Sequence, residues 1–263
     1  MAPRKLLALP LLVLLLSSAC ATGAASPTRS AKKEAAVDEP PSLATACGSA
    51  SGIRAEPFWL QTEDNVRLYA IGAGTGPFAV VLAHQGRSDL CEELPYTKTL
   101  IGAGLRVLAF DFRGNGHSAY PSKNALAYRR DFAAAIKHLK GEGATRVFLI
   151  GASMGGAAAV QNSGGLPFAG VVSLSGTRLW PGFGINKPGP RALRAPFLYI
   201  GSRSDYRAPL AEARTIVRNA GSRDKRSIFY RGSLHGWELV QSAPFAAKNR
   251  TLIHDWIQRH SHA

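Results

Sequence analysis

Apolar residues fall into short runs that, in the second half of the chain, alternate with longer amphipathic segments. The runs predict strands at 57–61, 66–72, 78–84, 105–111, 145–150, 168–175, 196–201 and 226–231. Helical spacing of apolar residues predicts helices at 92–103, 124–140, 153–163, 208–220 and 244–258. Because strands that alternate with helices form β-α-β units, the pattern predicts an α/β fold with a mostly parallel eight-stranded sheet flanked by helices.

A short motif lies between the predicted strand 145–150 and the predicted helix 153–163. Residues 151–155 read Gly-Ala-Ser-Met-Gly. A serine on such a strand-to-helix turn has a strained backbone, and glycines flank it because larger side chains would collide where the chain bends. The first amides of the helix would face the reaction centre and stabilise an oxyanion. GxSxG alone is a weak signal, but in this context it predicts that Ser153 is a nucleophile.

A nucleophilic serine needs a base that accepts its proton and an acid that orients the base. Asp205 is the candidate acid because it lies in the turn after the predicted strand 196–201, although an aspartate there could instead cap a helix or form the turn. His235 is the candidate base because it lies in the loop after the strand 226–231. These loops and Ser153 would converge at the carboxyl ends of parallel strands, where ligands bind.

The order Ser153, Asp205, His235 is that of the α/β-hydrolases. Residues 108–118 also resemble the strand-and-turn signature DxRGxGxS of that superfamily. From about Phe58 to the C-terminal helix the chain resembles the α/β-hydrolase superfamily, in particular small esterases, lipases and dienelactone-hydrolase-like enzymes. The resemblance implies the α/β-hydrolase fold. The segment between the sixth and seventh predicted strands is short and rich in proline and glycine, which predicts a minimal cap.

The segment 80–86 resembles the strand and loop that supply an oxyanion-hole amide in this family. The family usually has His-Gly where this chain has His84-Gln85. The resemblance implies that the amides of Met154 and Gly86 form the oxyanion hole, with Gln85 as the alternative to Gly86. We expect His84 to be a hydrogen-bonded anchor of the loop.

Two further groups of residues lie near these motifs. Asp111 and Arg113 are expected to be structural, bracing the oxyanion loop through an ion pair or a turn hydrogen bond. Four aromatic residues on loops at the active edge are candidates for lining the pocket, the alternative for each being simple packing of a loop: Trp180, Phe183, Tyr206 and Trp237.

The N-terminus has the pattern of a secretory signal over residues 1–19, with two basic residues, a short apolar stretch and small residues. Cys20 directly after them predicts a lipoprotein signal, in which Cys20 is lipidated and anchors the protein to a membrane. Ser17 stands where leucine is usual, so cleavage after Ala21, giving a secreted or periplasmic protein, is the alternative. Residues 20–46 have the composition of a disordered tether, and 47–263 is then the catalytic domain.

With Cys20 assigned to lipid, Cys47 and Cys91 remain. In an exported protein we expect them to form a disulfide, which would staple the start of the domain beside the oxyanion loop. The sequence contains no CxxC and no HExxH motif, so we expect neither a metal site nor a cofactor.

The chain is strongly basic, with a formal net charge of +15. The positive residues are dispersed and form no recognised nucleic-acid motif, so nucleic acid is a poor explanation for them. Attraction to anionic lipid or cell-wall polymer fits better, although a solvated basic surface with no partner is commoner.

Together these features predict an exported serine hydrolase that cleaves small-molecule or lipid carboxylic esters through an acyl-enzyme. An acyltransferase or a peptidase or amidase is the alternative within the same chemistry, because the acyl-enzyme is shared and the pocket selects the acceptor. A noncatalytic envelope-binding protein on a hydrolase scaffold is the alternative from another class. The presence of all three candidate triad residues argues against it.

Overall fold

A computed structural model of the chain describes residues 38–48, 52–123, 125–178, 189–242 and 244–261. The predicted signal peptide, Cys20 and the tether up to residue 37 lie outside these residues. So do two of the four candidate pocket aromatics, Trp180 and Phe183. Each statement below concerns the described residues.

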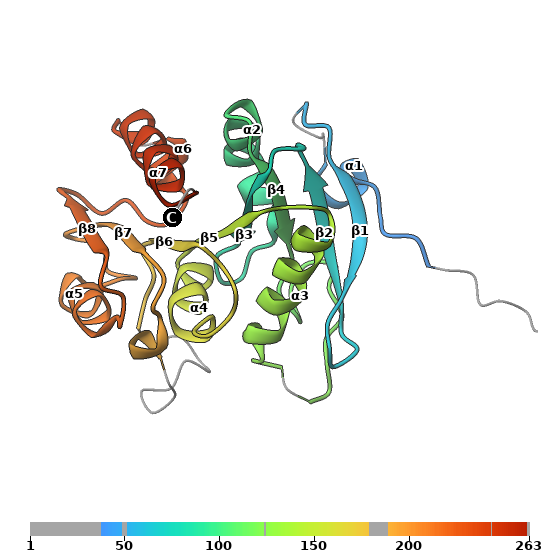
Figure 1. Cartoon of the computed structure of the whole chain (residues 1–263), viewed down its shortest axis with the longest axis horizontal. Helices are drawn as coiled ribbons and strands as arrows, with labels where there is room; N and C mark the ends of the chain where they lie inside the picture. Colours follow the sequence, from blue (N-terminus) through green and yellow to red (C-terminus); the bar gives the residue numbers. More distant parts are fainter. Residues whose placement is uncertain (1–37, 49–51, 124, 179–188, 243, 262–263) are drawn as a thin grey trace, which may run out of the picture. The chain divides into compact units, whose positions relative to one another are not determined.

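One eight-stranded sheet forms the centre of the domain, with strand order β1-β2-β4-β3-β5-β6-β7-β8 (Figure 1). Its pairs are parallel except β1 with β2 and β2 with β4. All the predicted strands are present, with ends shifted by at most two residues: β1 (Glu56–Gln61), β2 (Arg67–Ala73), β3 (Phe78–Ala83), β4 (Arg106–Phe110), β5 (Arg146–Ala152), β6 (Gly170–Leu174), β7 (Phe197–Ser202) and β8 (Lys225–Tyr230). The predicted α/β fold, with a mostly parallel eight-stranded sheet flanked by helices, is confirmed. Most of the segment predicted to be a minimal cap lies outside the described residues.

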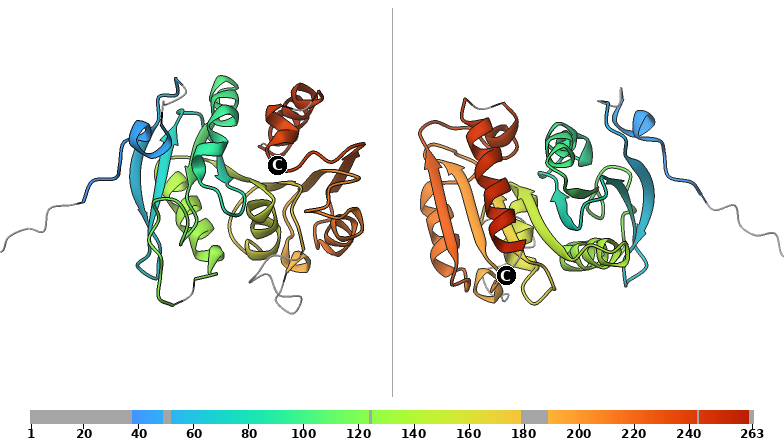
Figure 2. Two further views of the ribbon diagram at one scale, coloured as in Figure 1. Left: turned by 180° about the vertical axis from the view of Figure 1, so that it is seen from behind. Right: turned by 45° about the horizontal axis from the view of Figure 1, so that its top comes forward.

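Helices cover both faces of the sheet (Figure 2). One face packs against α3 (Tyr128–Gly141), α4 (Met154–Asn162) and α5 (Leu210–Asn219). The other packs against α1 (Leu43–Cys47), α2 (Leu94–Gly102), α6 (Glu238–Gln241) and α7 (Ala246–Ser261). Two short 3₁₀ helices, η1 (Leu90–Glu93) and η2 (Pro190–Ala192), complete the described elements. Sequence patterns predicted neither α1, α6 nor η2, because each is too short to show a helical period.

The two core layers arise from the alternation of side chains along the central strands. On β3, Val81 packs on the α3–α4 face and Val80 on the α2–α7 face. On β5, Leu149 and Ile150 divide in the same way. Because both faces are covered, these strands are almost wholly apolar, as parallel strands require.

The domain begins earlier than the predicted boundary at residue 47. The indole N–H of Trp59 donates to the carbonyl oxygen of Asp38 (2.6 Å), and the Tyr69 hydroxyl donates to that of Pro41 (3.0 Å). Leu43 of α1 is buried in the core. The predicted tether is therefore wrong for residues 38–46. These residues are polar on average, and composition alone does not reveal that they include one capped helical turn with a single buried leucine.

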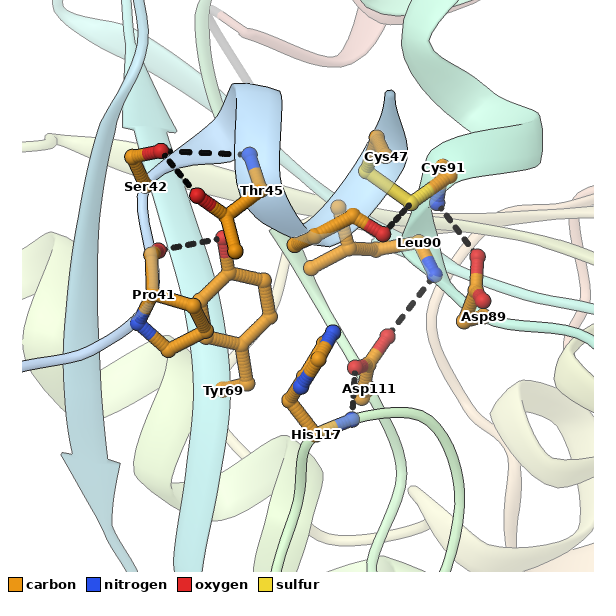
Figure 3. Close-up of a disulfide and its surroundings, with 11 residues drawn as sticks. Pro41, Ser42, Thr45, Cys47, Tyr69, Asp89, Leu90, Cys91, Asp111 and His117 are labelled. Carbon is orange, nitrogen blue, oxygen red and sulfur yellow. Dashed lines mark hydrogen bonds between the residues drawn. A yellow bond between two sulfur atoms is a disulfide. The ribbon is translucent and has the colours of Figure 1, made fainter.

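The predicted disulfide between Cys47 and Cys91 is confirmed, with Cα atoms 5.4 Å apart (Figure 3). It joins the end of α1 to η1, in the connection that leads from β3 to α2. None of the described helices is both long and apolar enough to cross a membrane.

Candidate active site

Ser153 occupies the sharp turn between β5 and α4, with φ 48° and ψ −111°. Such a positive φ is strained for a residue with a side chain. A Cβ on Gly155 would lie 2.0 Å from the carbonyl oxygen of Ala83, and one on Gly151 would lie 2.4 Å from the carbonyl carbon of Gly155. Both glycines of the motif are therefore required by close backbone contacts. Ser153 is 8% exposed, so its side chain is nearly buried.

Asp205 and His235 are in direct contact. The imidazole Nδ1 of His235 lies 2.6 Å from Oδ2 of Asp205, and both side chains are buried. The other carboxylate oxygen of Asp205 accepts from the amides of Arg207 (3.0 Å) and Ala208 (3.3 Å). An ionised aspartate requires Nδ1 to carry the hydrogen, which leaves Nε2 as the acceptor. Asp205 therefore also forms the turn, which was the alternative considered for it, and this role is compatible with its contact with His235.

The loop that carries His235 is fixed against its neighbours. The main-chain N–H of His235 donates to Oε2 of Glu238 (2.8 Å), and the Ser202 hydroxyl donates to the carbonyl oxygen of Leu234 (2.7 Å). A Cβ on Gly236 would lie 3.3 Å from the Cβ of Ala152, the residue before Ser153. The histidine loop therefore passes directly beside the serine turn.

The serine and histidine are not hydrogen-bonded in the described structure. Among the described residues, the hydroxyl of Ser153 has no hydrogen-bond partner. In unliganded sites this bond is often long and tightens when substrate binds. The Asp205–His235 half of the predicted triad is thus preformed, and Ser153 stands on the adjacent turn.

The connection from β3 to η1 lies along the start of α4, because the amide of Gly155 donates to the carbonyl oxygen of His84 (3.1 Å). In that connection, the amide of Gln85 donates to Oε1 of Glu92 at 2.6 Å. The alternative oxyanion donor Gln85 is therefore already occupied. Within the described parts of the chain, the amides of Gly86 and Met154 donate to no other group.

His84 anchors this connection, as its sequence position indicated. Its Nδ1 lies 2.6 Å from the carbonyl oxygen of Gln85, and its Nε2 accepts from the amide of Phe112 at 3.0 Å. Complete burial lowers the pKa of His84 to about 4. The imidazole is thus neutral and joins the end of β3 to the connection after β4.

Asp111 braces the same connection, whereas Arg113 does not. Asp111 accepts from the amides of Leu90 and His117, both at 2.8 Å (Figure 3). Burial raises the pKa of Asp111 to about 6, although these two hydrogen bonds act against that rise.

Arg113 is fully buried and pairs with Asp131 of α3 (2.7 Å) and with Asp64 of the β1–β2 turn (2.9 Å). It therefore joins α3 to that turn. The prediction of a structural role holds for Arg113, but its partners lie away from the oxyanion loop.

Of the two candidate pocket aromatics that the structure describes, Trp237 is 2% exposed and packs on Tyr96 in the core. Packing, rather than substrate contact, accounts for it. Tyr206, in the loop of Asp205, is 76% exposed and remains a candidate. In the described ranges no cluster of His, Cys, Asp or Glu could hold a metal ion.

Glu92 and Glu238 were missed by sequence reasoning. Glu238 could have been found, since a glutamate three residues after a loop residue commonly reaches back to its amide. Glu92 has no such signal, because its partner Gln85 lies in a loop without a helical or strand period.

Comparison with known proteins shows which protein family this chain belongs to. The model of the alpha/beta hydrolase family matches residues 80–262. No curated protein sequence matches the chain. Among solved structures, the chain is similar to an esterase of Pyrococcus furiosus, with a TM-score of 0.69 and 18% identity over 85% of this chain and 97% of that one.

Two further solved structures show the same likeness. An esterase of Exiguobacterium antarcticum has a TM-score of 0.63 and 17% identity over 77% of this chain and 100% of that one. A monoacylglycerol lipase of Paleococcus ferrophilus has a TM-score of 0.60 and 20% identity over 73% of this chain and 99% of that one. At such identities the likeness concerns the fold.

Proposed function

Because this chain belongs to the alpha/beta hydrolase family, we propose that it is a serine hydrolase that cleaves carboxylic esters of small molecules or lipids. The observation that carries the proposal is the buried Asp205–His235 contact beside the strained turn of Ser153. The similar esterase and lipase structures support the choice of an ester bond over other acyl bonds.

The residues have separate tasks in this mechanism. The hydroxyl of Ser153 attacks the ester carbonyl while Nε2 of His235 takes its proton, and Asp205 holds the imidazole in the required tautomer. The amides of Met154 and Gly86 stabilise the tetrahedral oxyanion. The protonated His235 then gives its proton to the leaving alcohol, and water, deprotonated by the same imidazole, releases the acid from Ser153.

The test is covalent labelling by a fluorophosphonate together with hydrolysis of p-nitrophenyl esters. We expect the wild-type protein to be labelled and to turn over ester, and Ser153→Ala to lose both. Ser204→Ala is the matched control, because Ser204 lies exposed on the loop of Asp205 and only its backbone is hydrogen-bonded there. Labelling without ester turnover would point to acyl transfer or amide cleavage, and a folded protein without labelling would refute the proposal.

We further propose that the protein is exported and that Cys20 is lipidated. The apolar stretch before Cys20 and the disulfide of the domain support an oxidising compartment. Mass spectrometry of the mature N-terminus tests this: a diacylated Cys20 is expected, and an N-terminus at residue 22 or at Met1 would contradict lipidation.

A further inference from the structure

Gln85 stands where the family usually has glycine, and both its backbone and its side chain are hydrogen-bonded to Glu92. The amide N–H of Gln85 donates to Oε1 of Glu92 (2.6 Å), and its side-chain Nε2 donates to Oε2 of the same carboxylate (2.9 Å). Hydrogen bonds to a charged acceptor are stronger than those between neutral groups. Two such bonds leave the following peptide, Gln85–Gly86, little freedom to rotate.

The side chain of Gln85 also reaches the histidine loop. A Cβ on Gly236 would lie 1.8 Å from Oε1 of Gln85, so the end of the Gln85 side chain packs closely against the backbone of Gly236. Gly236 directly follows His235. The side-chain amide of Gln85 therefore lies between the oxyanion loop and the loop that carries the candidate base, His235.

Glu92 is itself fixed from two sides. Its carbonyl oxygen accepts from Nε2 of Gln241 in α6 (2.7 Å), the helix that follows the histidine loop. Its neighbour Cys91 is tied to α1 by the disulfide (Figure 3). Because the backbone at Glu92 is held in this way, the Glu92 carboxylate can hold the oxyanion loop in one position.

We propose that Glu92 is a positioning residue for the oxyanion hole. Through its two hydrogen bonds to Gln85 it turns the Gln85 amide away from the reaction centre and orients the Gly86 amide toward the developing oxyanion. This role rests on the proposed function, because it acts on the transition state of acyl transfer to Ser153.

The main test is Glu92→Leu, which has a side chain of similar size but offers no acceptor to either N–H of Gln85. Both N–H groups then lose the carboxylate that holds them, so the loop shifts. We expect kcat to fall about 10- to 100-fold. KM should change little, since the oxyanion exists only in the transition state. Affinity for a boronic acid that mimics the tetrahedral state should fall by a similar factor.

The conservative variant Glu92→Gln distinguishes positioning from a merely structural role. Its carbonyl oxygen can accept from the main-chain N–H of Gln85, and its NH₂ can donate to Oε1 of Gln85 after that side-chain amide flips, because Oε1 has no partner among the described residues. We expect Glu92→Gln to retain most of the kcat that Glu92→Leu loses. Glu142→Leu is the matched control, because Glu142 is half-exposed and lies after α3, at the opposite end of the parallel strands. The kcat of Glu142→Leu should equal that of the wild type.

Each result decides between the possibilities. Unchanged kcat in Glu92→Leu, or an equal loss of kcat in Glu92→Gln, would overturn the positioning role while leaving the proposed function intact. If Glu92→Leu does not fold, Glu92→Asp keeps the charge but shortens the reach of the side chain, and must show a loss of kcat at constant KM. A wild-type protein without labelling or turnover would overturn both proposals.

Discussion

Glu93 provides a test of the buried electrostatics beside the oxyanion loop. Its side chain is fully buried, and neither carboxyl oxygen has a hydrogen-bond partner among the described residues. Burial, and after it the nearby carboxylates of Glu92, Asp111 and Asp89, raises the pKa of Glu93 well above its ordinary 4.5. We therefore expect Glu93→Gln, a neutral isostere of the protonated acid, to stabilise the protein at neutral pH.

The sign follows from proton linkage. Below pH 4.5 the carboxyl is protonated in both the folded and the unfolded chain, so it contributes no pH dependence. Above pH 4.5 the unfolded chain releases the proton while the folded protein retains it. The wild type then loses about 1.4 kcal/mol of unfolding free energy per pH unit up to the folded pKa, relative to a variant that cannot titrate.

Urea unfolding at intervals from pH 4 to pH 8 measures this difference. Glu93→Gln should match the wild type near pH 4 and become progressively more stable as the pH rises. Glu93→Leu removes the same titration without adding an amide, so the difference between its curve and that of the wild type should have the same slope. Parallel curves for all three proteins between pH 4.5 and pH 8 would refute the reasoning, because they would mean that the folded protein does not retain the proton.

Three further predictions concern the framework of the site. Replacing Cys47 and Cys91 together with serine opens a cross-link with a sequence separation of 44 and should lower the unfolding free energy by about 4 kcal/mol; a value equal to that of the oxidised wild type in urea unfolding would contradict this. Asp131→Asn leaves buried Arg113 with one carboxylate instead of two and should destabilise toward the lower end of about 3–5 kcal/mol, again measured in urea. Gly155→Ala places a Cβ against the carbonyl oxygen at the end of β3 and should abolish folding or fluorophosphonate labelling; circular dichroism and labelling like those of the wild type would contradict it.

The residues of the candidate site differ in how far the sequence reveals them. Ser153 is marked by glycines that its own turn requires, and Asp205 and His235 each follow a strand that is readable from its apolar run. These signals are local, so they can be recognised in the sequence without knowledge of the fold. The pairing of Asp205 with His235 follows once the strands are placed side by side in one parallel sheet.

Other contacts have no local signal. Arg113 pairs with Asp64 and Asp131, which are separated from it by 49 and 18 residues. Trp237 lies on a loop, yet it is buried against Tyr96. For each of these residues the partner is chosen by the packing of elements that are distant in sequence, so composition and period cannot identify it.

The sequence by itself determined the strands, the main helices and the serine turn, because backbone geometry and side-chain alternation depend on neighbouring residues. The disulfide was predicted differently, from the small number of cysteines and the assignment of Cys20 to lipid. Tertiary structure alone decided that the domain begins near Asp38, that Glu92 takes the amide of Gln85, and that Glu93 is buried without a partner. These outcomes depend on which surfaces meet across the sheet and on how much water they exclude. The free energies of buried charges and of long-range hydrogen bonds arise only from that assembly.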